Sequence, residues 1–397
     1  MSTPVHTFES AAMPDAPQDS SVRMTTLDLF AGAGGLSEGL NTAPGARFDP
    51  VRAVEMESAA AATYTLNHGG GCDDGNVKGG PAYVGTIQDW LAEDSSVPQV
   101  DLVVGGPPCQ GFSTLNRAGV GAERNELWKL YAETVERATP KYFVLENVPA
   151  FLKSAQWEVF QEALNGGSLK DYDIDVDVLN AADYGAFQAR KRVIVIGHHK
   201  DLPSPGLPRK THQGAHRSLA EALLGVPRAV DRLGIPDGTV EYWGNEIPGI
   251  FSTRELHFGR NYTQLSLDRF KAISHNGGSR SDLPDELKAP CWLKHSKGAG
   301  DVMGRLTWEK PSVTIRTEFF KPEKGRYIHP DQDRVITHYE AALIQGFPDD
   351  YRWVGTREEI ARQIGNAVPI PLGAAIGRTL VEAFDGTASA GTPIFAS

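Results

Sequence analysis

A cysteine in a loop shaped by glycine and proline is the residue best placed for nucleophilic chemistry in this chain. Residues 105–113 read GGPPCQGFS and follow the apolar run 100–104, so Cys109 comes just after a predicted buried strand. Ligands of open α/β sheets bind beyond the carboxyl ends of the strands, and two prolines fix the backbone before the thiol. A free cysteine is more often a small buried residue, but this loop favours a nucleophile.

A glycine-rich turn and an acidic residue predict a nucleoside site. Residues 28–35, DLFAGAGG, follow a short apolar strand. Ser37 stands where a dinucleotide fingerprint has its third glycine, and the lysine of a phosphate-binding loop is missing. Glu55 ends a second predicted strand, where an acid can bind ribose hydroxyls. Together these features favour a nucleoside cofactor without phosphates, for which S-adenosylmethionine is the candidate.

Two more charged segments border predicted strands. Glu146 closes the apolar strand 142–148, where a carboxylate is either solvated or a proton donor. Residues 188–192, QARKR, open a later strand, and alternation places Gln188, Arg190 and Arg192 on one face of it. That face is either a solvated basic edge or a cationic surface for an anionic or carbonyl-bearing substrate.

An alternation of strands and helices positions these groups. The pattern predicts a parallel, doubly wound α/β sheet of the Rossmann-like type, with the loops after its strands at one edge. The expected strands are 25–30, 52–58, 100–106, 142–148, 172–180 and 192–199. The expected helices are 36–43, 59–67, 126–138 and 369–384. Between residues 200 and 304 no clear period is visible.

Composition narrows the classes of protein. Three widely spaced cysteines without a CxxC pair argue against a zinc site and a disulfide framework, so no metal is expected. No apolar run approaches the length of a membrane span, and residues 1–22 read as a disordered tail, not as a signal peptide. We therefore expect a soluble cytoplasmic protein.

Charge is distributed unevenly along the chain. The net charge is −11, yet residues 188–334 contain 24 Lys and Arg against 17 Asp and Glu, and eight of the 11 histidines. A basic segment within an acidic chain favours a local surface for a polyanion such as nucleic acid.

The order of the motifs resembles that of the DNA cytosine-5 methyltransferases of bacteria and phages. The resemblance spans about residues 25–380, and only residues 200–304 have no matching motif. It is carried by DLFAGAGG, GGPPCQGFS, ENV, QARKRVIVIG, RVITHYEAALIQGFPDDY (334–351) and QIGNAVPIPLG (363–373).

The resemblance implies a covalent mechanism on a cytosine flipped out of duplex DNA. Cys109 would attack carbon 6 of the ring, which activates carbon 5 to accept the methyl group of S-adenosylmethionine. Glu146 would hold ring nitrogen 3, and Arg190 would bind the exocyclic oxygen. Arg192 would support Arg190 and the cysteine loop. Gln110, Ser113 and Gln188 would contact DNA.

The resemblance also implies the residues of the cofactor site. They are Phe30, Gly32, Gly34, Gly35, Leu36, Glu55, Met56, Ile87, Pro107, Leu127 and Asn366. Glu55 would take the ribose and Met56 would pack on adenine. One position departs from the family, which usually has an aspartate just before the residue matching Ile87, to read the adenine amino group. This chain has Thr86 there, and Asp89 is out of register.

The same resemblance divides the chain into segments. After the tail 1–22 come a catalytic, cofactor-binding domain (23–199) and a target recognition domain (200–304). Residues 305–384 return to complete the catalytic domain, and 385–397 form a second tail. Arg254, Arg260, Asn276 and Arg280 are candidates for base contacts in the recognition domain.

The expected partner is double-stranded DNA, bound by a monomer that associates with the nucleoid, without a membrane. A restriction endonuclease that acts on the same site, as in a restriction-modification system, is a further expected partner. Two alternatives stay open. One is a tRNA cytosine-5 methyltransferase on the same scaffold, although GFS after PPCQ favours DNA. The other is a DNA-binding regulator with a silent catalytic site, which the presence of Cys109, Glu146 and Arg190 disfavours.

Overall fold

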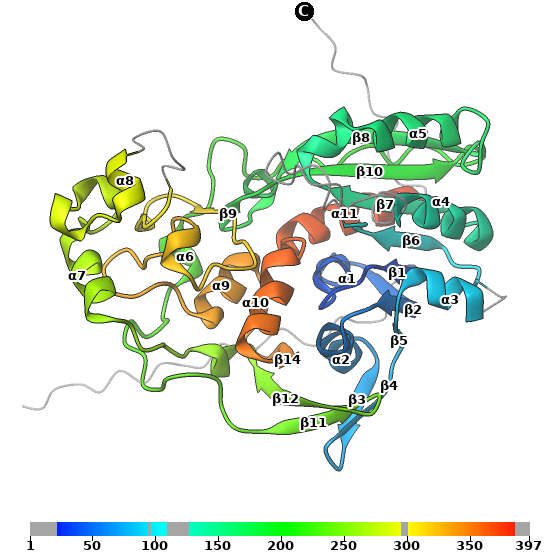
Figure 1. The fold of residues 1–397 in the computed structure, drawn as a ribbon. Coiled ribbons are helices and arrows are strands. Elements are labelled where there is room, and N and C mark those ends of the chain that lie inside the picture. The colour runs from blue at the N-terminus through cyan, green and yellow to red at the C-terminus, as the bar shows by residue number, and fades with distance from the viewer. Residues whose placement is uncertain (1–21, 94–96, 109–126, 295–300, 386–397) are drawn as a thin grey trace, which may run out of the picture.

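A seven-stranded sheet forms the core of one half of the molecule in the computed structural model, which describes residues 22–93, 97–108, 127–294 and 301–385 (Figure 1). The strand order is β5-β2-β1-β6-β7-β10-β8. In chain order the strands are β1 (Val22–Leu29), β2 (Ala46–Glu55), β5 (Ala82–Val84), β6 (Leu102–Gly105), β7 (Tyr142–Asn147), β8 (Tyr172–Asn180) and β10 (Lys191–His199).

The strands of this sheet are not all parallel. The pairs among β5, β2, β1, β6 and β7 are parallel, whereas β10 runs antiparallel to both β7 and β8. The expectation of a purely parallel sheet was therefore wrong at β10. The reversal matters because it brings the first residues of β10 to the edge where β1, β6 and β7 end.

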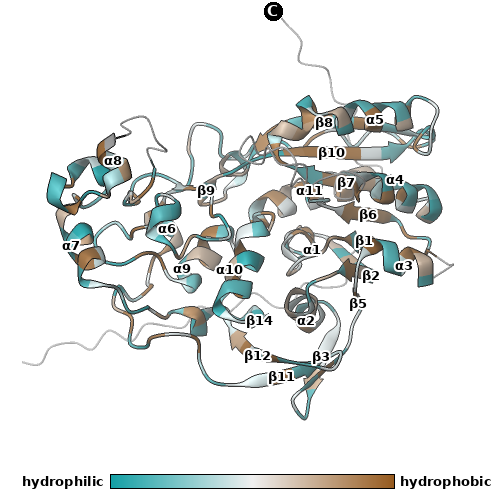
Figure 2. Ribbon diagram, viewed as in Figure 1, coloured by the Kyte–Doolittle hydropathy of each residue, from teal (hydrophilic) through white to brown (hydrophobic). Residues whose placement is uncertain are grey.

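Helices cover both faces of the sheet, as the doubly wound pattern predicted. Leu36 and Leu40 of α1 share a core with Leu372 and Ile376 of α11 on one face. Tyr131 of α4 belongs to the core on the other face. The helices along this half are α1 (Gly35–Asn41), α2 (Ser58–Asn67), α3 (Ile87–Glu93), α4 (Leu127–Ala138), α5 (Ala155–Leu164) and α11 (Ile370–Phe384). The central strand β6 is hydrophobic and buried along its length (Figure 2).

A second sheet joins three distant parts of the chain in the order β14-β12-β11-β4-β3. The strands are β3 (Gly70–Asp73), β4 (Asn76–Gly79), β11 (Thr239–Tyr242), β12 (Asn245–Ser252) and β14 (Arg352–Val354). Thus a hairpin from the predicted recognition segment pairs with strands from the first and last parts of the chain. The sequence pattern did not reveal this sheet, since its strands are short and rich in glycine and polar residues.

The segment 200–304 contributes to several hydrophobic cores, one of which joins Val240, Tyr242 and Ile247 to α2. Leu219, Phe251 and Leu256 pack with Ile344 and Ile364 of the returning segment. A separate core, which we call the outer lobe, consists of Phe270, Ile273, Leu283, Met303, Ile328 and Val335. The predicted boundaries at 200 and 304 therefore do not coincide with the limits of the cores.

The remaining helices and strands lie outside the two sheets described above. They are β9 (Gln188–Ala189), α6 (Leu219–Ala222), α7 (Gln264–Ala272), α8 (Pro290–Lys294), β13 (Ser312–Val313), α9 (His338–Gln345) and α10 (Arg357–Asn366). Short 3₁₀ helices occupy Pro149–Lys153, Ala181–Tyr184, Thr253–Leu256, Arg280–Asp282, Asp285–Leu287 and Pro322–Lys324. No single described helix is long and apolar enough to cross a membrane, and only the bent pair α10 and α11 has the length and composition together.

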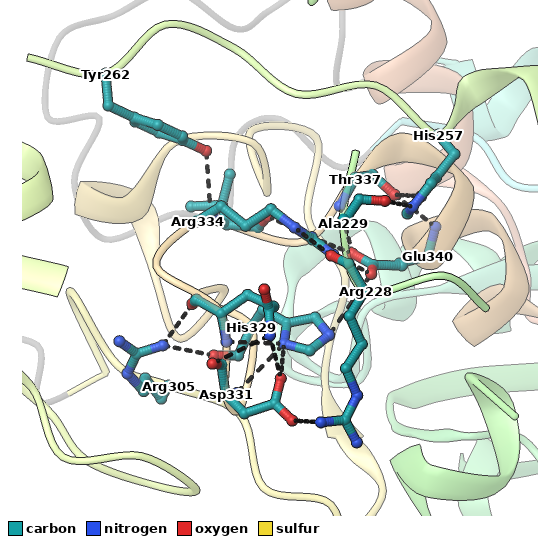
Figure 3. A network of polar contacts seen from close by, with 12 residues as sticks. Arg228, Ala229, His257, Tyr262, Arg305, His329, Asp331, Arg334, Thr337 and Glu340 are labelled. Carbon is teal, nitrogen blue, oxygen red and sulfur yellow. Dashed lines mark hydrogen bonds and ion pairs between the residues drawn. The ribbon is translucent and has the colours of Figure 1, made fainter. Parts of the chain in front are cut away.

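Buried ionic contacts fix the outer lobe to α9 (Figure 3). Arg334 donates to both carboxylate oxygens of Glu340, at 2.7 and 2.8 Å, and Glu340 is fully buried. The Tyr262 hydroxyl accepts from the Val335 amide at 3.1 Å. Arg305 donates to the carbonyls of Phe270, Ile273, His329 and Gln332 and to the Asp333 carboxylate.

Candidate active site

A cavity of about 880 Å³ opens where the strands of the large sheet end. It is lined by residues that follow β1, β2, β5, β6 and β7, by the start of β10, and by the end of α10. The predicted site residues found in its lining are Phe30, Gly32, Gly35, Leu36, Glu55, Met56, Ile87, Pro107, Leu127, Glu146, Arg190, Arg192 and Asn366. One cavity therefore contains both the expected cofactor groups and the expected base-binding groups.

The glycine-rich turn wraps one end of the cavity. Phe30, Gly32 and Gly34 have φ values of 57°, 56° and 87°, in the left-handed region that glycine adopts readily. Phe30 is the exception among them, since a bulky residue with positive φ is strained, and strain of this kind concentrates at ligand sites. Gly34 is the N-cap of α1, which begins at Gly35. The turn thus exposes backbone to a ligand and starts a helix at once.

Glu55 is held in place by the same turn. Its carboxylate accepts from the Gly32 amide and from the Glu57 amide, each at 2.8 Å. Burial raises the pKa of Glu55, while the two backbone hydrogen bonds oppose that shift. Met56, next in the chain, is 62% exposed at the cavity. These positions suit a ribose acceptor and an apolar platform.

A second acid lies deeper at the same end. The Asp28 carboxylate accepts from the Ser37 hydroxyl at 2.6 Å, and that hydroxyl lies 3.0 Å from the Tyr64 hydroxyl. Burial raises the pKa of Asp28 to about 7, against the hydrogen bonds from Ser37 and Tyr64. The sequence analysis did not single out Asp28, although it is the first residue of DLFAGAGG.

Thr86 stands where the family usually has an aspartate, but its hydroxyl is engaged by another residue of this chain. Its hydroxyl donates to the Asp89 carboxylate at 2.6 Å and accepts from the Asp89 amide at 3.1 Å. This reciprocal pair caps the start of α3. Ile87 is buried beside it, and Thr86, Ile87 and Gln88 all line the cavity.

The cavity fits S-adenosylmethionine by the chemistry of its groups. The cofactor end presents Asp28, Glu55 and Glu57. The lining from residues 28–36, 54–60 and 85–88 holds no cationic side chain, and Arg362 of α10, which also lines the cavity, lies 3.9 Å from Glu57. An acidic, partly apolar cleft with exposed backbone suits a phosphate-free nucleoside that carries positive charge.

Glu146 and Arg192 form an ion pair at the other end of the cavity. Arg192 Nε lies 2.6 Å from Glu146 Oε1, with only 15% and 13% of the two side chains exposed. The antiparallel register places Ile194 opposite Glu146 and so brings Arg192 to the end of β7. A Cβ on Gly106 would lie 2.9 Å from Glu146 Oε2, so the glycine gives the carboxylate its room.

Arg190 is placed differently from the expectation. It is 2% exposed and donates to the carbonyls of Ile315 at 2.8 Å, Gly365 at 3.0 Å and Asn366 at 3.5 Å. Burial, together with the charge of Arg192, lowers the pKa of Arg190 to about 9, which leaves it charged at neutral pH. The structure thus brings Arg192, and not Arg190, into contact with Glu146.

Gln188 is buried and bonded within the protein. Its amide oxygen accepts from the Ile315 amide at 3.1 Å, and its nitrogen donates to Gln345 Oε1 at 2.6 Å. The predicted contact of Gln188 with DNA is therefore not available in this conformation. Gly34 is the N-cap of α1 but is not in the described cavity lining. Cys109, Gln110 and Ser113 lie outside the described residues.

The sequence analysis missed several residues of the site. Thr314, Ile315, Arg316 and Thr317 form a wall of the cavity, and Arg362 and Gln363 of α10 add to it. Gln363 and Asn366 both belong to QIGN, so this motif was a usable signal. Nothing in the pattern of residues 314–317 marked them.

The side chains of three of the four candidates for base readout have partners inside the protein. Arg254 pairs with Asp349, Arg260 donates to the Phe320 carbonyl, and Asn276 donates to Glu309. Arg280 begins a 3₁₀ helix.

A sequence profile of the C-5 cytosine-specific DNA methylase family matches residues 24–382. The chain belongs to this family. The fold expectation is confirmed with it, because C-5 methylases have the Rossmann-like architecture seen here. The expected cofactor is likewise that of the family, which uses S-adenosylmethionine as methyl donor.

Relatives of the methylase occur in plants and bacteria. DNA (cytosine-5)-methyltransferase 2 of Arabidopsis thaliana is 31% identical over 91% of this chain, which spans 29% of that protein's length. The chain likewise spans about 30% of the length of other plant relatives. Type II methyltransferase M.XorII of Xanthomonas oryzae pv. oryzae is 31% identical over 90% of this chain and 84% of its own length.

Solved structures share the fold. A DNA modification methyltransferase encoded within an E. coli prophage superposes with a TM-score of 0.64 at 24% identity, covering 91% of this chain and 99% of its own. The Dnmt2 methyltransferase of S. pombe superposes with a TM-score of 0.61 at 16% identity, covering 91% of this chain and 100% of its own. At such identities the likeness establishes the fold alone.

Proposed function

We propose that this chain methylates carbon 5 of a cytosine in a specific sequence of duplex DNA. The observation that carries the proposal is the single cavity that joins the Glu55 turn to the Glu146–Arg192 pair, immediately beside residues 105–108 that lead to Cys109. Family membership, and the bacterial Type II methyltransferases among the relatives, support the same reaction.

The nucleophile in this proposal is Cys109. Its thiolate forms a bond to carbon 6 of the cytosine, and the electrons of the 5,6 double bond then make carbon 5 nucleophilic. S-adenosylmethionine, when bound, supplies an electrophilic methyl group. After carbon 5 is methylated, it loses its proton to a base, and the sulfur of Cys109 leaves carbon 6 to restore the ring.

Glu146 and Arg192 hold the base in this proposal. The Glu146 carboxyl faces ring nitrogen 3 and shares a proton with it as charge builds during the attack. Arg192 orients Glu146 through their 2.6 Å contact and offers its remaining donors to the exocyclic oxygen. This assignment moves the base-side role from Arg190 to Arg192, because both Nη atoms of Arg190 donate to backbone carbonyls.

Delivery of the base requires that it leave the duplex, since stacking hides both faces of the ring. We propose that residues 200–304 and the outer lobe supply the DNA contacts, with phosphate contacts giving most of the affinity. In the same proposal the protein acts as a monomer in the cytoplasm at the nucleoid, with a restriction endonuclease of the same site specificity as its partner.

A trapping experiment tests the covalent step. Duplex DNA in which 5-fluorocytosine replaces cytosine should form an adduct that survives SDS, because fluorine cannot leave carbon 5 as a cation. Cys109→Ser should form no adduct and yet bind S-adenosylhomocysteine normally. Cys72→Ser and Cys291→Ser are matched controls, since both thiols are exposed, and they should form the adduct. An adduct that persists in Cys109→Ser would refute the assignment of the nucleophile.

A further inference from the structure

Arg190 joins two segments that are far apart in the sequence. Its guanidinium donates through Nη1 to the Ile315 carbonyl at 2.8 Å and through Nη2 to the Gly365 carbonyl at 3.0 Å. Gly365 is at the end of α10, where helix carbonyls lack partners within the helix. Arg190 therefore caps α10 and holds the segment at Ile315, which follows β13, with one rigid group.

Gln188 and Gln345 repeat this link. Gln188 accepts from the Ile315 amide and donates to Gln345, as β9 pairs with β13 through Ser312 and Gln188. Gln345 in turn donates to the Ile364 carbonyl, and to the Ala367 carbonyl at 3.4 Å. A second chain of hydrogen bonds thus runs from the same strand to the same helix end.

The two segments also touch directly at Gly365. A Cβ on Gly365 would lie 2.5 Å from the carbonyl carbon of Arg316 and 2.5 Å from the Thr317 amide nitrogen. The glycine permits an approach of two backbones that no other residue allows. A displacement of one segment must therefore displace the other.

Both segments line the cavity. Asn366, the last residue of α10, and the residues after it lie beside the glycine-rich turn, where a Cβ on Gly35 would lie 2.9 Å from Ala367 Cβ. In residues 314–317, Arg316 lies 3.3 Å from Asp301, which is two residues before Met303 of the outer-lobe core. Arg192, two residues after Arg190, contacts Glu146.

We propose that Arg190 is a positioning residue that couples cofactor binding to DNA binding. The proposal rests on the proposed function. Cofactor that orders the segment at Asn366 fixes the carbonyls that Arg190 holds, and thereby fixes the wall at residues 314–317 that meets the DNA side. By linkage, DNA must favour the cofactor by the same factor.

The substitution Arg190→Lys tests the geometry of the Arg190 donors separately from the charge. Lysine keeps the positive charge, but its single ammonium cannot reproduce the planar fork that reaches carbonyls on two segments. Arg190→Lys should therefore weaken the link while it retains a buried cation. Arg305 offers a matched control, because it is fully buried, also bonds to carbonyls, and is absent from the described lining of the cavity.

The test measures a coupling factor in the full-length protein. The Kd for a duplex carrying the methylated site is determined with and without saturating S-adenosylhomocysteine, and the ratio is the coupling factor. The wild type should show about fivefold or more. Arg190→Lys should bring the factor close to one, while Arg305→Lys should keep the wild-type factor whatever its stability. A general loss of stability does not predict this difference.

Gly365→Ala attacks the same link from the other side and replaces Arg190→Lys if the latter does not fold. It should also bring the coupling factor close to one, and Gly71→Ala is its control, because nothing lies within 4 Å of a Cβ there. The proposal is overturned if the wild type binds both ligands without coupling, or if the folded Arg190→Lys or Gly365→Ala protein keeps the wild-type factor. If the wild type binds neither ligand, the proposed function itself fails.

Discussion

Arg305 and Arg190 are both buried and both donate to backbone carbonyls, yet their surroundings differ. In the outer lobe, Arg305 bonds through Nε, Nη1 and Nη2 to four carbonyls and to Asp333. At the cavity, Arg190 bonds to three carbonyls, and its Nε is a buried donor without a hydrogen-bond partner among the described residues. Every guanidinium nitrogen of Arg305 therefore has a hydrogen-bond partner, whereas Arg190 has one nitrogen without a partner in the described residues.

Buried acids show the same contrast. In Glu340, burial alone would raise the pKa, but the two hydrogen bonds and the charge of Arg334 lower it (Figure 3). In Asp28, burial dominates, no cation in the described part of the chain is paired with the carboxyl, and the pKa rises to about 7. Both carboxyls are buried, so their opposite pKa shifts come from their different partners and not from the extent of burial.

Buried side chains with complete hydrogen bonding support the fold, whereas several with incomplete hydrogen bonding line the cavity. Five buried side-chain atoms in the described residues lack a hydrogen-bond partner, and those of Glu146, Arg190 and Gln363 belong to residues that line the cavity. For Glu146 Oε1 the close contact with Arg192 is an ion pair without hydrogen-bond geometry. Incomplete bonding costs stability and is retained where a ligand completes it. The outer lobe has no such atom in its described part.

The largest expected effect on stability comes from removing Arg305. Arg305→Met leaves four carbonyls and the Asp333 carboxylate without their donor, so the free energy of unfolding should fall by about 3–5 kcal/mol. Arg190→Met should cost less, about 1–2 kcal/mol, because it strands no carboxylate and removes a cation buried without one. Urea denaturation at pH 7.5 measures both. An equal or larger loss in Arg190→Met would break the comparison.

Neutralising Glu340 should come next in size. Glu340→Gln keeps the shape but leaves the Arg334 guanidinium without its carboxylate, at a cost of about 3 kcal/mol at pH 7.5. The lowered pKa gives the sign, since a depressed acid contributes stability above its unfolded pKa and loses it as the pH falls. Glu133→Gln is the control, because its pair with Arg137 is exposed and should be worth less than about 0.5 kcal/mol.

Neutralising Asp28 should raise the free energy of unfolding at high pH, whereas neutralising Glu340 should lower it. The folded pKa of about 7 lies above the ordinary aspartate pKa of 3.8, so the contribution of the neutral carboxyl is complete below pH 3.8 and is lost as the pH rises through 7. Asp28→Asn should therefore be more stable than the wild type at pH 8, by roughly 2 kcal/mol, and gain little at pH 4. Denaturation curves at the two pH values decide this. A destabilised Asp28→Asn at pH 8 would show that the carboxyl has an unrecognised cationic partner.

Much of the catalytic half could be predicted from the sequence. Glycine-rich turns and apolar runs fix the ends of β1, β6 and β7, because these signals are local. The same signals led to Glu55, Glu146 and Arg192, all of which line one cavity.

The features that could not be predicted depend on contacts between segments that are far apart in the sequence. The direction of β10 follows from its partners β7 and β8, and that direction decides whether Arg190 or Arg192 reaches Glu146. The alternation in QARKR placed both arginines on one face and could not rank them. The wall at residues 314–317 depends on Gly365, and no local pattern links two segments that far apart.

The most direct test of the central claim follows a labelled methyl group from S-adenosylmethionine. The full-length protein is incubated separately with duplex DNA and with tRNA, and the nucleosides are identified by mass spectrometry after digestion. Bisulfite sequencing of the DNA then locates the sites. The account predicts 5-methylcytosine in the duplex at one recognised sequence, and none with Cys109→Ser. Label only in tRNA, or no 5-methylcytosine in DNA from a protein that binds S-adenosylmethionine, would contradict it.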